Sequence, residues 1–212
     1  MSKSLALMEF QSVAVGVLAV DRMLKKSPVA LLRCGTVHPG RYLALVGGSV
    51  AATEEAYTEG VAVGRESSVL VDEVYLADPH PSLAILQETM VSSPVEPDGD
   101  TVGVLEVSTS ATLLRILDAV LKAVPITLTE IRLGDDLGGK ALAVITGLLS
   151  DVQEAVRLAG DGAGISDGVG GEVLGASIMS NVDQTLRQVL GEGTHFARCR
   201  NWMPGGAEIL ED

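Results

Sequence analysis

The stretch Leu7-Met-Glu-Phe10, followed by Asp21-Arg-Met-Leu-Lys25, has a counterpart later in the same chain. The counterpart is Val104-Leu-Glu-Val107, followed by Asp118-Ala-Val-Leu-Lys122, and every matched residue is displaced by 97 positions. A proline then follows each copy at the same displacement. Self-similarity at a fixed spacing is the signature of duplicated structural units. The sequence therefore predicts a tandem duplication of one domain.

Farther along, the two copies stay in order but the displacement grows to 99 positions. Gly40-Arg-Tyr-Leu-Ala44 matches Gly139-Lys-Ala-Leu-Ala143 at this new displacement. The change in displacement falls between Leu32 and Gly40 in the first copy and between Thr129 and Gly139 in the second, which has two residues more. Because insertions concentrate in exposed loops, we expect each of these segments to be a loop.

Hydrophobic periodicity within each copy predicts the order strand, helix, strand, loop, strand, helix, strand and short helix. The clearest strands are 43–46, 69–76, 102–107 and 142–145, and the clearest helices are 111–124 and 150–158. This pattern predicts an α/β fold of the α+β sandwich type, with a sheet on one side and helices on the other. We expect domains at 1–92 and 101–190, a linker within 91–100 and a separate tail at 191–212.

The composition excludes several classes of partner. The chain has 28 acidic and 15 basic side chains, a net charge of −13, which argues against nucleic acid and anionic membranes. Its longest apolar stretch, Val13–Val20, is far shorter than the roughly 20 residues of a membrane-spanning helix. The mean hydropathy of +0.34 instead favours a protein that buries surface against copies of itself. Two cysteines and no evident signal peptide indicate a cytoplasmic protein.

Catalytic patterns are weak in this sequence. Glu9 and Glu106 each lie in an apolar strand, where burial could tune a general base. A satisfied structural carboxylate or a solvent-facing strand residue is the simpler interpretation, because no nucleophile accompanies either glutamate. None of the three histidines, His38, His80 and His195, has a recognisable catalytic context.

Taken together, the motifs resemble those of the bacterial microcompartment shell domain. The resemblance rests on five features: the strand glutamate, the Asp-x-x-Leu-Lys helix, the following Pro-Val or Pro-Ile, the glycine-rich loop and the apolar strand that ends in glycine. Two copies in tandem resemble the trimer-forming, tandem-domain shell proteins. The order of elements, with the glutamate-bearing strand first, resembles the non-permuted type of these proteins, as found in the shells of propanediol-utilisation compartments. The resemblance covers about residues 5–90 and 102–190.

This resemblance implies a structural protein without catalytic activity. Three chains would supply six domains to a flat, pseudo-hexagonal homotrimer located in the shell of a microcompartment in the cytoplasm. Such tiles would pack with other microcompartment shell proteins, and small metabolites would pass through a central pore. The resemblance places the pore at Thr36, Val37, His38, Pro39 and Gly40 of the first copy and Gly134, Asp135, Asp136, Leu137 and Gly138 of the second.

The resemblance also assigns a role to Lys25 and Lys122, which would lie at the tile edge and pack against the neighbouring tile. A plainer interpretation pairs each lysine with the aspartate four residues earlier, Asp21 or Asp118, on a helix surface. The two interpretations are compatible.

Two alternatives remain open at the sequence level. Some relatives hold an iron–sulfur cluster at the three-fold pore through a cysteine in the first-copy loop, but here His38 precedes the proline. We therefore expect no cofactor, with a metal ion on His38 or a cluster in an electron-conducting module as the alternative. The other alternative is a small homo-oligomeric enzyme with its site between the repeats.

Overall fold

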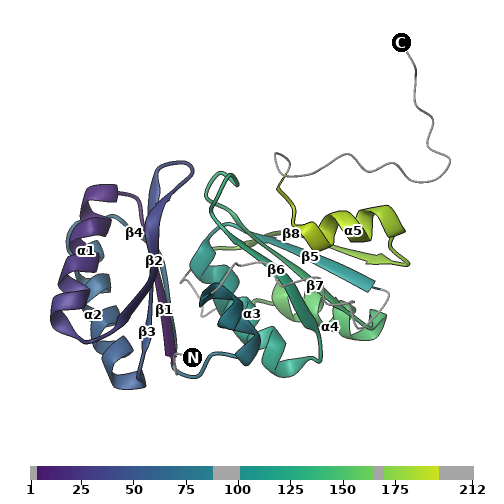
Figure 1. Cartoon of the computed structure of the whole chain (residues 1–212), viewed down its shortest axis with the longest axis horizontal. Helices are drawn as coiled ribbons and strands as arrows, with labels where there is room; N and C mark the ends of the chain where they lie inside the picture. Colours follow the sequence, from purple (N-terminus) through teal and green to yellow (C-terminus); the bar gives the residue numbers. More distant parts are fainter. Residues whose placement is uncertain (1–3, 88–100, 165–169, 196–212) are drawn as a thin grey trace, which may run out of the picture.

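The computed structural model describes residues 4–87, 101–164 and 170–195, and it contains two copies of one α/β unit (Figure 1). The first copy comprises β1 (Ser4–Phe10), α1 (Val13–Lys26), β2 (Ala30–Val37), β3 (Arg41–Gly48), α2 (Val50–Glu66), β4 (Leu70–Leu76) and the 3-10 helix η1 (Pro81–Gln87). The second comprises β5 (Thr101–Val107), α3 (Ser110–Ala123), β6 (Thr127–Leu133), β7 (Ala141–Gly147), α4 (Leu149–Gly160), β8 (Val173–Ser180) and α5 (Gln184–Glu192).

Each copy forms a four-stranded antiparallel sheet, ordered β2-β3-β1-β4 in the first, which we call sheet A, and β6-β7-β5-β8 in the second, sheet B. The expected order of elements and the fold class are confirmed. The expected linker lies outside the described residues, as does the expected tail beyond residue 195. Among the described residues, none of the helices combines the length and apolarity that crossing a bilayer requires.

The first helices of the two copies begin and end through the same local chemistry. The Ser12 hydroxyl accepts the Val15 N–H at the start of α1, and the Thr109 hydroxyl accepts the Thr112 N–H at the start of α3 (both 3.4 Å). These are standard N-caps, which satisfy backbone donors that the helix itself leaves unpaired. Both helices end two residues before a proline, which disfavours the helical conformation of the residue that precedes it.

The loops expected at 32–40 and 129–139 are shorter than predicted, because strands occupy 32–37 of the first segment and 129–133 of the second. Strand β2 continues to Val37, so residues 38–40 alone connect it to β3, and the second hairpin has a longer tip at 134–140. Both hairpins contain a bulge at the matching place, between Leu31 and Arg33 and between Leu128 and Glu130. The copies therefore stay in register up to the end of the strand. The two extra residues are confined to the tip, where they break no ladder hydrogen bonds.

Sheet A has helices on both faces, because the second copy supplies one layer. On one face, Met8, Phe10 and Tyr42 pack in a core with Met23 of α1. On the other face, Leu7 of β1 and Val74 of β4 belong to the core that contains α3. Figure 1 shows α1 and α2 on the outer side of sheet A and α3 on the side that faces sheet B. The two copies thus share a core.

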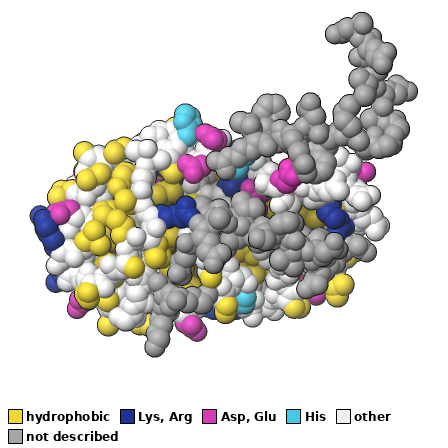
Figure 2. All heavy atoms as spheres, in the orientation of Figure 1, with side chains coloured by type: hydrophobic (Ala, Val, Ile, Leu, Met, Phe, Trp, Pro, Cys, Tyr) yellow, Lys and Arg dark blue, Asp and Glu magenta, His cyan; other side chains and the backbone are white. Residues whose placement is uncertain are grey.

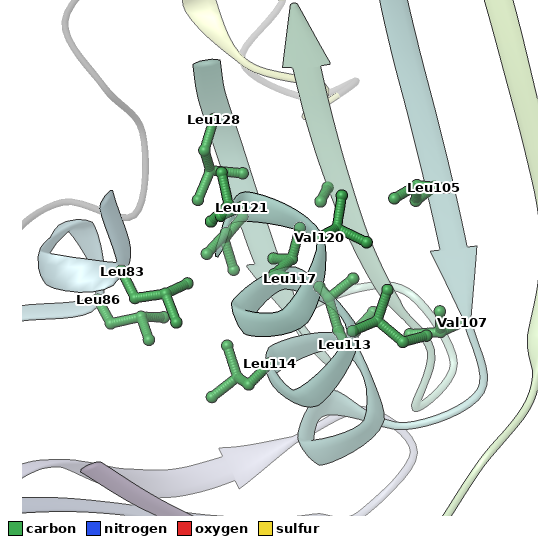
Figure 3. Close-up of a cluster of buried hydrophobic side chains, with 14 of the residues drawn as sticks. Leu83, Leu86, Leu105, Val107, Leu113, Leu114, Leu117, Val120, Leu121 and Leu128 are labelled. Carbon is green, nitrogen blue, oxygen red and sulfur yellow. The ribbon is translucent and has the colours of Figure 1, made fainter. Parts of the chain in front are cut away.

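Helix α3 is buried far more completely than α1. Nine of its residues are buried, against four in α1. Figure 3 shows Leu83 and Leu86 of η1 directed toward α3, with Leu113 of α3 facing Val107 of β5 on the opposite side. All four leucine and valine side chains are at most 1% exposed. Helix α3 therefore packs simultaneously on its own sheet and on the first copy.

Candidate functional site

The tips of the two β-hairpins lie side by side, and Figure 1 shows both at the same end of the molecule. The Arg41 guanidinium donates from Nη1 to the Gly139 carbonyl oxygen at 3.3 Å. A Cβ atom on Gly134 would come within 2.9 Å of Val37, and Gly134 has a φ of +74°, which favours glycine. The structure therefore brings the two predicted pore segments into contact within one chain.

The polar groups on these tips are open to solvent. His38, Asp135 and Asp136 are all exposed. Figure 2 shows histidine and acidic side chains gathered at the end of the molecule where the hairpins lie. The second tip is anchored from below by Arg132, whose Nη2 donates to the Asp135 carbonyl oxygen at 2.9 Å. One chain thus presents an imidazole and two carboxylates on a fixed, exposed turn surface.

Within the described residues, no group of three or more His, Cys, Asp or Glu side chains is positioned to hold a metal ion. A metal ion on His38 would need ligands from further copies of the chain or from outside these residues. It stays a prediction, as does the assignment of the pore residues. Cys34 lies in β2 and is exposed, and Cys199 lies outside the described residues.

Glu9 is a satisfied structural carboxylate, as the simpler interpretation held. It is fully buried on β1, where the Arg41 guanidinium lies 2.5 Å from Oε1 and the Ser110 N–H donates to Oε2 at 3.0 Å. Burial raises the pKa of Glu9, whereas Arg41 and the Ser110 N–H lower it and nearby Asp72 raises it. Glu106, its counterpart in β5, is only half-buried and pairs with Lys140 Nζ at 2.9 Å.

A second buried carboxylate, Asp72 of β4, connects the two copies and was not singled out from the sequence. The Thr109 hydroxyl and the Thr112 hydroxyl (2.7 Å) both donate to Oδ2, and Arg115 donates to Oδ1 at 3.2 Å. The Arg115 guanidinium also donates to the Glu73 carbonyl oxygen. The available signal was Arg115, a charged residue in the largely apolar first half of helix 111–124. The sequence does not show that its partner, Asp72, lies 43 positions away.

Lys25 and Lys122 form the helix ion pairs that the plainer interpretation predicted. Lys25 Nζ lies 2.7 Å from Asp21, and Lys122 Nζ lies 2.7 Å from Asp118. Lys122 also donates to the Asp78 carbonyl oxygen at 2.6 Å, so it spans the two copies. Exposed pairs of this kind stabilise a fold by at most about 1 kcal/mol. A role at the tile edge stays a prediction.

His80 has a structural role at the junction of the copies. Its backbone N–H donates to Asp118 Oδ1 at 2.7 Å, and its Nδ1 accepts the Ser82 N–H at 3.2 Å at the start of η1. The same place in the second copy is taken by Asp183, whose Oδ1 accepts the N–H groups of Thr185 and Leu186 at the start of α5. Strand pairing supports this match, because Leu76 lies opposite Leu5 and Met179 lies opposite the matched residue Val102. The elements η1 and α5 are therefore equivalent.

The BMC domain family matches the chain twice, at residues 4–79 and 101–182. The chain belongs to the bacterial microcompartment (BMC) domain family. Among curated proteins, it is similar to the bacterial microcompartment shell protein PduT of Citrobacter freundii, with 33% identity over 164 residues, covering 77% of this chain and 86% of that protein. Among solved structures, it is similar to a microcompartment protein from Desulfitobacterium hafniense DCB, with a TM-score of 0.71, 27% identity and coverage of 89% of this chain and 99% of that one.

These findings confirm the resemblance on which the functional predictions rest. The family consists of structural shell proteins rather than enzymes, so the predicted structural role is confirmed and the enzyme alternative is dropped. The duplicated motifs correspond to two BMC domains in tandem.

Replacing Arg41 with Met tests the buried ion pair. The variant leaves Glu9 buried without its cation, which we expect to lower the free energy of unfolding by about 3–5 kcal/mol at pH 7. The pKa of Glu9 is raised in the folded protein, so Glu9 contributes fully to the free energy of unfolding at pH values below its unfolded pKa of 4.5. This contribution is lost as the pH rises through the pKa of Glu9 in the folded protein. Removing Arg41 raises that pKa further, so the loss is smaller at pH 4 than at pH 7, as urea unfolding at both values can measure.

The matched control is Arg157→Met, which removes an exposed guanidinium paired with Glu154 and Asp161. We expect its effect to stay within about 1 kcal/mol at both pH values. Equal losses for Arg41→Met at pH 4 and pH 7 would contradict the assignment of Glu9 as the group that responds.

Proposed function

We propose that three copies of the chain close into a pseudo-hexagonal ring, which serves as a tile of a bacterial microcompartment shell with a pore at the hairpin tips. One observation carries this proposal. Within one chain, the two domains meet where α3 of the second packs against sheet A and η1 of the first. The equivalent surfaces, α1 of the first domain and sheet B with α5 of the second, are exposed on the chain.

The first surface is the outer side of the helix. In α3, Leu114 and Leu121 are 1% and 5% exposed, because sheet A and η1 cover them. The counterparts in α1, at a displacement of 97 residues, are Val17 and Leu24, which are 52% and 43% exposed. Figure 2 shows hydrophobic side chains gathered over the first copy. Helix α1 therefore carries an apolar outer side that nothing in the described chain covers.

The second surface is the sheet face with the short helix beside it. In the first copy, Leu83 and Leu86 of η1 are fully buried against α3. Their counterparts in α5 are Leu186, which is 40% exposed, and Val189, which is half-buried. Every residue of α5 keeps part of its surface exposed. Along β8, the strand equivalent to β4, most residues are exposed as well.

These two surfaces differ from each other, so copies that use them associate head to tail. A head-to-tail contact forms a ring if its rotation closes and an open filament if it does not. If the contact between chains repeats the contact within a chain, two domains per chain and a six-domain ring require three chains. This is the arrangement that the resemblance implies. The similarity of this chain to a curated shell protein supports its assembly with other shell proteins.

The hairpin tips support a pore at the centre of such a ring. The two tips of one chain are in contact, so a ring would gather all of its tips around one axis. Exposed Asp135 and Asp136 from each chain would then surround His38 with acidic groups. A negative field of this kind attracts cations and disfavours anionic metabolites.

Replacing Val17 with Asp tests assembly. The change places an unpaired carboxylate in the proposed contact, and we expect it to weaken association by more than about 100-fold. Sedimentation should show a trimer for the wild-type chain and a monomer for the variant at micromolar concentration. Leu148→Asp, at an apolar position that is 62% exposed outside the proposed contact, should remain trimeric. A wild-type chain that stays monomeric would overturn the proposal.

Replacing Lys25 with Asp tests the tile edge. The change reverses one charge beside Asp21, and like charges in a desolvated edge contact are destabilising. We expect intact trimers that no longer form extended sheets in electron micrographs at low salt. Lys26→Asp changes the same charge one position away and serves as the control. Sheets of unchanged extent in Lys25→Asp would remove Lys25 from the edge.

Neutralising Asp135 and Asp136 together as Asn tests the pore. We expect assembled shells of this variant to admit small anionic dyes faster than wild-type shells, because the negative field is gone. Glu54→Gln with Glu55→Gln removes the same charge from α2 and should leave anion entry unchanged. Metal analysis of the wild-type trimers tests the alternative: about one ion per trimer, lost in His38→Ala, would favour a metal-bearing conduit.

A further inference from the structure

We infer that a polar cluster on sheet A makes the contact within the chain chemically distinct from the contact between chains, and that in the contact between chains Leu18 of α1 lies against Gly175 of the neighbouring chain. The inference rests on the proposed trimer and specifies how its copies recognise one another. Sheet A accepts α3 and rejects α1, whereas sheet B of a second copy accepts α1.

The sheet A side of the contact requires polar partners. Glu9 and Asp72 are 0% and 2% exposed, and both lie on the face that meets α3. Helix α3 and its cap supply the donors, which are the Ser110 N–H, two threonine hydroxyls and the Arg115 guanidinium. A carboxylate buried without such donors is strongly destabilising. Any helix that docks here must therefore carry matching polar groups.

Helix α1 does not carry them. At a displacement of 97 residues, Arg115 corresponds to Leu18 and Thr112 corresponds to Val15. Leu18 is 45% exposed and points away from the core of its own domain. Were α1 of one copy to dock on sheet A of another, Asp72 would lose both its cation and the Thr112 hydroxyl. A first domain therefore cannot substitute for a second domain beside sheet A.

Sheet B has the complementary composition. Strand pairing fixes the equivalence, because Glu9 of β1 lies opposite Asp72 and Glu106 of β5 lies opposite Gly175. The Asp72 carboxylate of sheet A is thus replaced by a hydrogen atom in sheet B, whereas Glu9 has a counterpart in Glu106, which pairs with Lys140. A Cβ atom built on Gly175 would meet nothing within 4 Å, so the position is open. An apolar side chain from α1 fits this space without leaving any charge unpaired.

The two contacts therefore differ in kind although their backbones correspond. The contact within the chain pairs Arg115 with Asp72, and the contact between chains pairs Leu18 with Gly175. Discrimination between partners depends on the difference between correct and incorrect pairings, and an unpaired buried charge supplies that difference. The two contacts are therefore not interchangeable: α1 against sheet A would leave Asp72 without its partners, and α3 against sheet B would leave Arg115 without a partner equivalent to Asp72.

Transplanting the pair from one contact to the other tests the inference in the full-length chain. Gly175→Asp alone buries a second carboxylate beside Glu106, and Leu18→Arg alone buries a guanidinium where the nearby carboxylate, Glu106, is already paired with Lys140. We expect each change to raise the dissociation constant of the trimer more than about tenfold. The double variant rebuilds the Arg–Asp pair between chains, so its dissociation constant should return to within about threefold of the wild-type value. Leu18→Met and Gly175→Ala change the same positions without charge and should remain trimeric.

Sedimentation gives the dissociation constants, and circular dichroism shows that each variant is folded. If the wild-type chain is not a trimer, the proposed function fails before this test begins. If the wild-type chain is a trimer but both single changes are neutral, or if the double variant is as weak as the weaker single one, the inference is overturned. Recovery in the double variant supports it, because two changes that acted independently would add rather than cancel.

Discussion

The burial of α3 on both sides is the constraint on which the rest of the structure depends. Its inner side completes the core of the second domain, and its outer side covers sheet A of the first. Neither the Asp72 cluster nor η1 would be buried without it. A helix enclosed in this way fixes the rotation between the two domains, because packed cores tolerate little displacement. If the contact between chains repeats this rotation, the rotation determines whether successive chains close into a ring.

Duplication gives the chain two versions of one contact that can change independently. The version within the chain carries buried charges, and their desolvation is offset by hydrogen bonds from the cap and first turns of α3. The exposed version on α1 carries Val13, Val17 and Leu18 instead. An apolar contact tolerates small shifts in register, whereas a hydrogen-bonded carboxylate fixes both position and direction. The chemistry thus places the directional contact where the copies are covalently linked.

The fold followed from the sequence because its decisive signals are local. Residues 102–107 and 111–124 show the periods of a strand and a helix, and Pro125 marks where that helix ends. The repeat then doubled this information. The hairpin was predicted poorly, since insertion mapping locates a length difference without showing how far the strand extends. Asp72 was missed for another reason: its partners lie in the other domain, and no local pattern specifies contacts 37 to 43 positions apart.

Arg41 connects the domain contact to the hairpin tips. Its guanidinium pairs with Glu9 in the buried cluster and also donates to the Gly139 carbonyl oxygen in the second tip. Glu9 in turn accepts the N–H at the start of α3. A continuous path of hydrogen bonds therefore joins α3, the core of sheet A and the surface that carries His38 and Asp135. The position of the tips is thus set by the contact between domains rather than by the turns alone, and a change that loosens the contact should also move the tips.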